Sequence, residues 1–171
     1  MSIVPVELVK KRIVYISISP SVVRGQKSGT MKEIINYLVS INLENFSKVK
    51  DEKNFNHLLD MYTNEPGKKI KCWGIARKAI NIFLFQASHD IVLNRKYNLN
   101  KIIPYLELIL DNNNAKKLVK YAKQKGINLE WEKIKSLDKK TNKKFQKVAK
   151  KYAHEEYKCE RCYLEFYLWH S

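Results

Sequence analysis

An adjacent arginine and lysine, Arg77 and Lys78, stand at the head of a strongly apolar run in the segment CWGIARKAINIFLF, residues 72–85. Burial among apolar side chains disfavours the charged form of a lysine, and a neighbouring cation acts in the same direction. A lysine whose pKa is lowered in this way can act as a nucleophile. Lys78 is thus either a solvent-facing lysine on a core helix or a lysine that the chemistry of the protein requires at this place.

The same region could also bind phosphate. Five basic residues and no acidic residue lie between Gly67 and Ala87. The free N–H groups at the start of a helix, together with nearby cations, favour a bound anion. The candidate phosphate contacts are Gly74, Arg77, Lys69 and Lys71. The loop SVVRGQKSGT, residues 21–30, is a weaker second candidate because it matches no phosphate-loop consensus, and Arg24 is its candidate contact.

The motif GIARKAINIFL, residues 74–84, resembles the hairpin of the helix-hairpin-helix DNA glycosylases such as endonuclease III and 8-oxoguanine glycosylase. In that superfamily a glycine turn precedes Arg-Lys, a small residue and an apolar helix that contains Asn. The lysine at this place is the nucleophile of the bifunctional members, and Lys78 matches it. The family aspartate at the start of a later helix is matched by Asp111, so the resemblance covers roughly residues 70–118.

The resemblance implies a DNA glycosylase/AP lyase that removes a damaged or modified base from double-stranded DNA. Asp111 would stabilise positive charge on the sugar, and Lys78 would attack the sugar carbon to give a Schiff base that permits strand cleavage. A base must leave the stack before it is excised, which requires an aromatic pocket. The candidates for that pocket are Trp73, Trp131 and Trp169. The chain departs from the family in having Ala76 at the second hairpin glycine and three asparagines after Asp111.

The charge of the chain predicts a polyanionic partner. Lys and Arg number 33 against 17 acidic residues, which gives a net charge of +16 and a pI near 9.7. A field of this sign attracts nucleic acid or an anionic membrane. Lysine outnumbers arginine 28 to 5, as in proteins from AT-rich genomes, but that bias does not remove acidic residues. We expect nucleic acid as the partner and no membrane; an acidic protein is a further alternative.

Lysine is densest between Ala115 and Lys151, where fourteen lysines accompany three acidic residues. Like charges at i,i+4 destabilise a helix, so a helix that accepts several such pairs usually faces a counter-charge. The candidate nucleic-acid contacts here are Lys139, Lys143, Lys147 and Lys150. They suit either the glycosylase hypothesis or a non-catalytic nucleic-acid-binding module, and the plainest alternative is a solvated helix face.

The elements that would position these residues are mostly helical. We expect one domain, residues 1–171, made of an N-terminal strand and loop arm (1–29) and a helical body (30–171) with a helix-hairpin-helix element. Val14, Ile16 and Ile18 alternate with polar residues, which predicts a short strand. A capping box of Thr30 and Glu33 would begin the next helix.

The cysteines predict neither a disulfide framework nor a metal. Cys159 and Cys162 form half of a zinc signature and His154 and His170 flank them, but the histidine spacings match no standard finger. We expect buried thiols, no metal and no cofactor. Few cysteines, no signal peptide at the N-terminus and no apolar run of membrane-spanning length lead us to expect a cytoplasmic protein.

Overall fold

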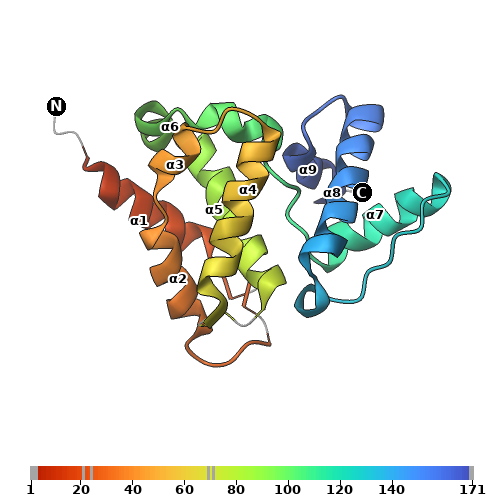
Figure 1. Cartoon of the computed structure of the whole chain (residues 1–171), viewed down its shortest axis with the longest axis horizontal. Helices are drawn as coiled ribbons and strands as arrows, with labels where there is room; N and C mark the ends of the chain where they lie inside the picture. Colours follow the sequence, from red (N-terminus) through yellow and green to blue (C-terminus); the bar gives the residue numbers. More distant parts are fainter. Residues whose placement is uncertain (1–3, 21, 24, 69, 71, 170–171) are drawn as a thin grey trace. The chain divides into compact units, whose positions relative to one another are not determined.

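The computed structural model describes residues 4–20, 22–23, 25–68, 70 and 72–169, and these residues form helices and no strand (Figure 1). The prediction of a mostly helical fold is confirmed. The chain divides into two compact units, Met1–Tyr105 and Leu106–Ser171. Each unit is described by itself below.

The first unit is built around one long helix, α5 (Trp73–His89). Eleven of its 17 residues are buried, as expected for a helix that is apolar on nearly every side. Helices α1, α2 and α4 and the 3₁₀ helix η2 all contact it. The other elements of this unit are α1 (Val6–Ser17), α2 (Thr30–Ser40), α3 (Leu43–Ser47), α4 (Glu52–Asn64), η1 (Glu65–Lys68), α6 (Ile91–Tyr97) and η2 (Leu99–Tyr105).

The predicted N-terminal strand is wrong, because residues 6–17 form helix α1. The buried stripe of this helix has helical spacing and contains a charged residue: Lys10, Ile13, Val14 and Ser17. The Lys10 ammonium donates a hydrogen bond to the carbonyl oxygen of Val39 at 2.6 Å. Burial lowers the pKa of Lys10, and the nearby Glu7 opposes that shift.

Helix α2 begins at Thr30, one residue earlier than the predicted capping box requires, since that motif makes Thr30 the N-cap. Gly29 occupies the N-cap position with φ of 88°, a left-handed conformation that glycine adopts without strain. No side chain caps this end. The backbone N–H of Glu33 donates to the carbonyl of Gly29 instead.

The second unit packs its helices around an extended, buried segment, residues 106–110. Its elements are α7 (Asn112–Gln124), η3 (Ile134–Ser136), α8 (Lys139–Tyr152), the π-helical turn η4 (Ala153–Tyr157), η5 (Arg161–Tyr163) and α9 (Leu164–Trp169). Helix α7 contacts both α8 and α9.

Side chains replace the strand partner that the segment 106–110 lacks. The Gln146 amide donates to the carbonyl of Leu108 and accepts from its N–H, both at 2.9 Å. Asn114 donates to the carbonyl of Ile109 at 2.8 Å, and Arg161 Nε donates to that of Leu106 at 2.9 Å. Buried backbone groups need partners of this kind, so Gln146 fixes α8 on the segment.

Within the part of the chain that the structure describes, no helix combines the length and apolar character needed to cross a bilayer.

Candidate nucleic-acid interface

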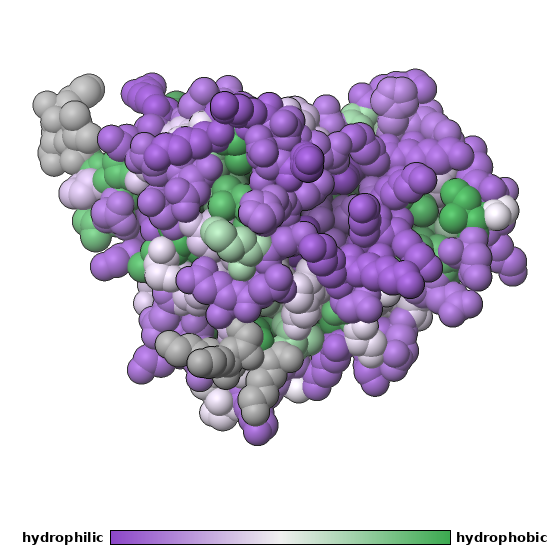
Figure 2. Space-filling view, viewed as in Figure 1, coloured by the Kyte–Doolittle hydropathy of each residue, from purple (hydrophilic) through white to green (hydrophobic). Residues whose placement is uncertain are grey.

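The lysines of α8 share one side of the helix. Seven of its 14 residues are lysines and none is acidic. At about 100° per residue the lysines fall within an arc of about 140°. We call this surface the α8 lysine face; it consists of Lys139, Lys140, Lys143, Lys144, Lys147, Lys150 and Lys151. All seven residues are exposed, and the surface over α8 is strongly hydrophilic (Figure 2).

The opposite side of α8 holds the helix in the second unit. Its buried residues are Asn142, Phe145, Gln146, Val148 and Ala149. The amide of Asn142 donates to the buried Glu107 carboxylate at 3.0 Å. At the N-terminus, the Asp138 carboxylate accepts from the backbone N–H of Thr141 at 2.7 Å. The lysine face is therefore carried by a capped helix with a fixed rotation.

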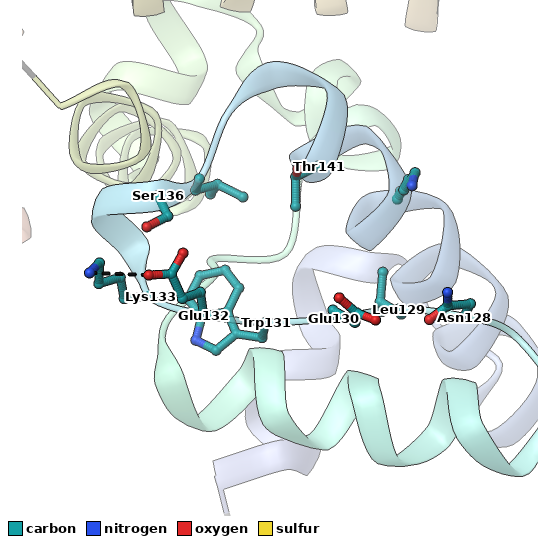
Figure 3. A pocket seen from close by; sticks show the side chains of 10 residues that line it. Asn128, Leu129, Glu130, Trp131, Glu132, Lys133, Ser136 and Thr141 are labelled. Carbon is teal, nitrogen blue, oxygen red and sulfur yellow. Dashed lines mark ion pairs between the residues drawn. The ribbon is translucent and has the colours of Figure 1, made fainter.

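A groove with a volume of about 560 Å³ lies beside the start of this face. It runs along the segment 128–137, which includes η3, and reaches Thr141 and Lys144 of α8. Figure 3 shows Glu130 and Trp131 on the segment and Thr141 across the cavity from them. The groove is lined by Asn128, Leu129, Glu130, Trp131, Glu132, Lys133, Ser136, Leu137, Thr141 and Lys144.

Trp131 is fixed in this groove by two contacts. Its indole Nε1 donates to Asn112 Oδ1 at 3.0 Å. Its ring meets that of Phe145 edge-on, with the centroids 5.4 Å apart. The side chain is half-buried, so a rigid aromatic surface is presented to a cavity of ligand size.

The other two candidate pocket tryptophans do not line this groove. Trp73, in the first unit, donates from Nε1 to Asn64 Oδ1 at 3.1 Å and lies under the guanidinium of Arg77 at 5.3 Å. Trp169, at the end of α9, is 72% exposed. Of the three tryptophans, Trp131 is thus the one on the groove wall.

Arg77 points into the first unit, contrary to the expectation that it contacts phosphate. Its side chain is 5% exposed, and Nη1 lies 2.9 Å from Asp60 Oδ1. The same nitrogen donates to Thr63 Oγ1 at 3.1 Å. The reason is the position of Arg77 on a helix buried on nearly every side, where a cation requires a partner inside the protein.

The proposed catalytic pair is divided between the two units. Lys78 is half-buried on α5 in the first unit. Asp111 is the N-cap of α7 in the second, and its Oδ1 accepts from the N–H of Asn114 at 2.9 Å. Gly74 lies inside the first turn of α5, whereas the family hairpin places its glycine in the turn. A shared catalytic site for Lys78 and Asp111 stays a prediction.

The predicted residues Arg24, Lys69, Lys71 and His170 lie outside the described residues. Among the residues that are described, no group of three or more His, Cys, Asp and Glu side chains could hold a metal ion. Burial raises the pKa of the Cys162 thiol to about 12, as expected for a structural thiol.

Sequence reasoning missed a ladder of tyrosines beside the end of α8. Tyr121 and Tyr152 stack with centroids 4.0 Å apart, Tyr152 lies 5.6 Å from Tyr157, and Tyr157 stacks on Tyr167 at 4.2 Å. Burial raises the pKa of Tyr152 to about 12. The four residues come from α7, α8, η4 and α9, so no local sequence pattern indicates them.

An acidic residue, Glu155, lies at the same end of α8. The Glu155 carboxylate accepts from the Tyr121 hydroxyl at 2.7 Å and lies 3.3 Å from Lys125 and 3.7 Å from Lys151. The bond from Tyr121, together with these cations, holds the pKa of Glu155 below its ordinary value. The positive charge of the lysine face is therefore partly balanced at Lys151.

No protein-family model, curated protein or solved structure matches this chain. The resemblance to the helix-hairpin-helix glycosylases therefore stays a prediction that depends on the motif around Lys78.

Proposed function

We propose that the protein binds nucleic acid through the α8 lysine face. The observation that carries the proposal is the arrangement of seven exposed lysines on one side of a helix that contains no acidic residue. Lysine acts as a point charge on phosphate and provides little base selectivity. This surface would supply affinity for the sugar–phosphate backbone.

The arrangement calls for an external counter-charge. Lys139 and Lys143, Lys143 and Lys147, and Lys147 and Lys151 are like-charged pairs at i,i+4. Each such pair disfavours the helix by roughly 0.2–0.5 kcal/mol. A phosphate backbone that lies along the face would offset this repulsion and release its own counterions.

Binding to a labelled duplex and a labelled single strand, titrated across salt concentrations, tests the proposal. We expect affinity to fall steeply with salt for wild type. The triple reversal K143E/K147E/K150E should weaken binding to all sequences alike and reduce the salt slope by about 3, one unit for each phosphate that the variant no longer neutralises. The matched control K11E/K32E/K53E reverses three exposed lysines on α1, α2 and α4.

The control separates a local contact from the overall charge. Both triple variants change the net charge equally, so a general electrostatic effect would weaken binding to the same extent in both. Equal losses, or unchanged binding by K143E/K147E/K150E, would remove the α8 lysine face from the interface.

Base excision is a second proposal, favoured by the half-buried position of Lys78 on a helix that is buried on most sides. Borohydride trapping on a panel of oligonucleotides with damaged or abasic sites tests it. Wild type should give a covalent adduct, and K78A should give none while its DNA affinity stays nearly unchanged. No adduct with wild type on any lesion would reject the lyase chemistry and leave the binding function in place.

A further inference from the structure

The acidic residues of the lysine-rich region are concentrated at one place. Residues 115–151 contain only three, Glu130, Glu132 and Asp138. Asp138 caps α8, and the other two line the groove around Trp131. Lys144 belongs both to the groove and to the α8 lysine face. Two carboxylates and two lysines, Lys133 and Lys144, line this groove, so it carries no net formal charge beside a strongly positive surface.

The groove is less suited to phosphate than the α8 lysine face, because two carboxylates line it. The Glu132 carboxylate lies 3.1 Å from the Lys133 ammonium. A hydrogen bond from the Ser136 side chain and this cation hold the pKa of Glu132 below its ordinary value. A carboxylate only accepts hydrogen bonds, so it repels a phosphate and attracts an N–H group. The remaining lining offers the Trp131 ring, the Asn128 amide, the Thr141 hydroxyl and two leucines.

We propose that the groove around Trp131 binds an unpaired base that carries an exocyclic amino group, while the neighbouring lysine face holds its phosphates. This inference rests on the proposed function. Because the groove and the lysine face share Lys144, a strand whose phosphates follow α8 brings its bases to the groove. A volume of about 560 Å³ suits a ligand of nucleotide size.

The strand must be single at this point. A base in a duplex uses its Watson–Crick edge for pairing, whereas an unpaired base can stack on an aromatic side chain and present that edge to the protein. The carboxylates of Glu130 and Glu132 would accept from the amino group. Cytosine offers an N4 amino group with two N–H donors, whereas uracil offers a single N3–H between the O2 and O4 acceptors, so this pair tests recognition of the amino group.

Equilibrium binding of matched single strands, oligodeoxycytidine and oligodeoxyuridine of about ten nucleotides, tests the inference. Wild type should bind the cytidine strand about tenfold more tightly. In E130Q/E132Q the ratio should fall to about one, because a glutamine amide can also donate to uracil O4. Affinity for the uridine strand should not fall, because two negative charges have been removed.

The control variant is E7Q/E33Q. It removes two exposed carboxylates from the first unit and changes the net charge by the same amount as E130Q/E132Q. It should keep the preference for cytidine. If the control loses the preference to the same extent, the effect is one of overall charge and the groove is not the site.

A second measurement follows Trp131 in the wild-type protein, in which the groove is unchanged. In wild type, the indole N–H resonance of Trp131, assigned from W131F, should shift on addition of the cytidine strand and respond less to the uridine strand. The resonance of Trp73, which belongs to the first unit and does not line the groove, serves as the internal reference. No shift at Trp131 when the cytidine strand is bound would overturn the inference.

The failures of the two proposals are distinguishable. If both strands bind equally well and K143E/K147E/K150E still weakens them, the groove proposal is overturned and the proposed function stands. A cytidine preference that survives in E130Q/E132Q also overturns the groove proposal. If neither strand nor duplex binds, the proposed function is overturned and this inference with it.

Discussion

Helices α5 and α8 both carry basic residues, but they use them in opposite ways. Helix α5 is buried on most sides, and its Arg77 turns inward to Asp60 and Thr63. Helix α8 divides into a buried side and a lysine side, with no cation among its buried residues. A cation on a helix that is apolar all round thus serves the fold, whereas cations gathered on one side of an amphipathic helix are available to a partner.

Removing the buried ion pair of Arg77 with Asp60 should have the largest effect on stability. Arg77→Ala leaves the Asp60 carboxylate without its guanidinium, and such a change costs about 3–5 kcal/mol. The free energy of unfolding from urea denaturation measures it. The neighbouring K78A is the matched control and should change stability far less, because Lys78 is half-buried.

The result also decides what Arg77 does. If R77A keeps wild-type stability and loses affinity for DNA, Arg77 is a nucleic-acid contact and the contrast between the two helices is wrong.

The buried side of α8 is tested by Gln146→Ala. The change removes both hydrogen bonds to Leu108 and leaves its buried N–H and carbonyl groups without the partners that Gln146 provides. This should reduce the free energy of unfolding by about 2–3 kcal/mol. Q124A, at an exposed position of α7, should have little effect. Below its melting temperature, Q146A should keep its affinity for nucleic acid, because the lysine face is unchanged. A large loss of affinity in the folded variant would show that the two sides of α8 are not independent.

The N-caps of α7 and α8 allow a smaller, paired comparison. Asp111→Ala and Asp138→Ala each remove one carboxylate cap and should each reduce stability by about 1 kcal/mol in thermal unfolding. Asp111→Asn should change stability by only about a few tenths of a kcal/mol, because asparagine caps nearly as well. If base excision occurs, D111N should slow it by orders of magnitude. An unchanged excision rate would restrict Asp111 to capping.

The smallest expected effect is a pH dependence at the end of α8. The pKa of Glu155 is depressed in the folded protein, so its contribution to stability is present above the ordinary value of 4.5 and is lost as the pH falls through the folded pKa. Melting temperatures measured from neutral pH down to acid should fall slightly less for E155Q than for wild type. Identical acid profiles would show that the contacts of Glu155 with Tyr121 and Lys151 add nothing to stability.

The amphipathic character of α8 could be predicted from sequence because its pattern is local. Phe145, Val148 and Ala149 recur at helical spacing and the lysines fall between them. The same reasoning failed at α1, where the buried stripe includes Lys10 and the exposed side carries Tyr15 and Ile16. In α1 a charged residue is buried and large apolar residues are exposed, so the pattern of an amphipathic helix was hidden. The β-branched residues also favoured the prediction of a strand.

The candidate site was only partly predictable for a similar reason. The spacing of the lysines can be read in the sequence, but the Asp60 partner of Arg77 lies 17 residues away on another helix. The burial of Gln146 could have been predicted, because Asn142 and Gln146 extend the stripe of Phe145 and Ala149 at i,i+4 spacing. Polar residues within an apolar stripe indicate buried hydrogen bonds, here to the segment 106–110.

Because of the pairing of Gln146 with Leu108, these two positions should tolerate substitution to different extents. Both hydrogen bonds end on the backbone of Leu108 and none on its side chain. Position 108 is therefore free to change among apolar residues of similar volume, whereas position 146 requires a group that both donates and accepts. Even glutamate, nearly identical in shape, would fail there once ionised, because it has no N–H to give. Among natural or engineered variants of this chain, position 146 should vary less than the residue it holds.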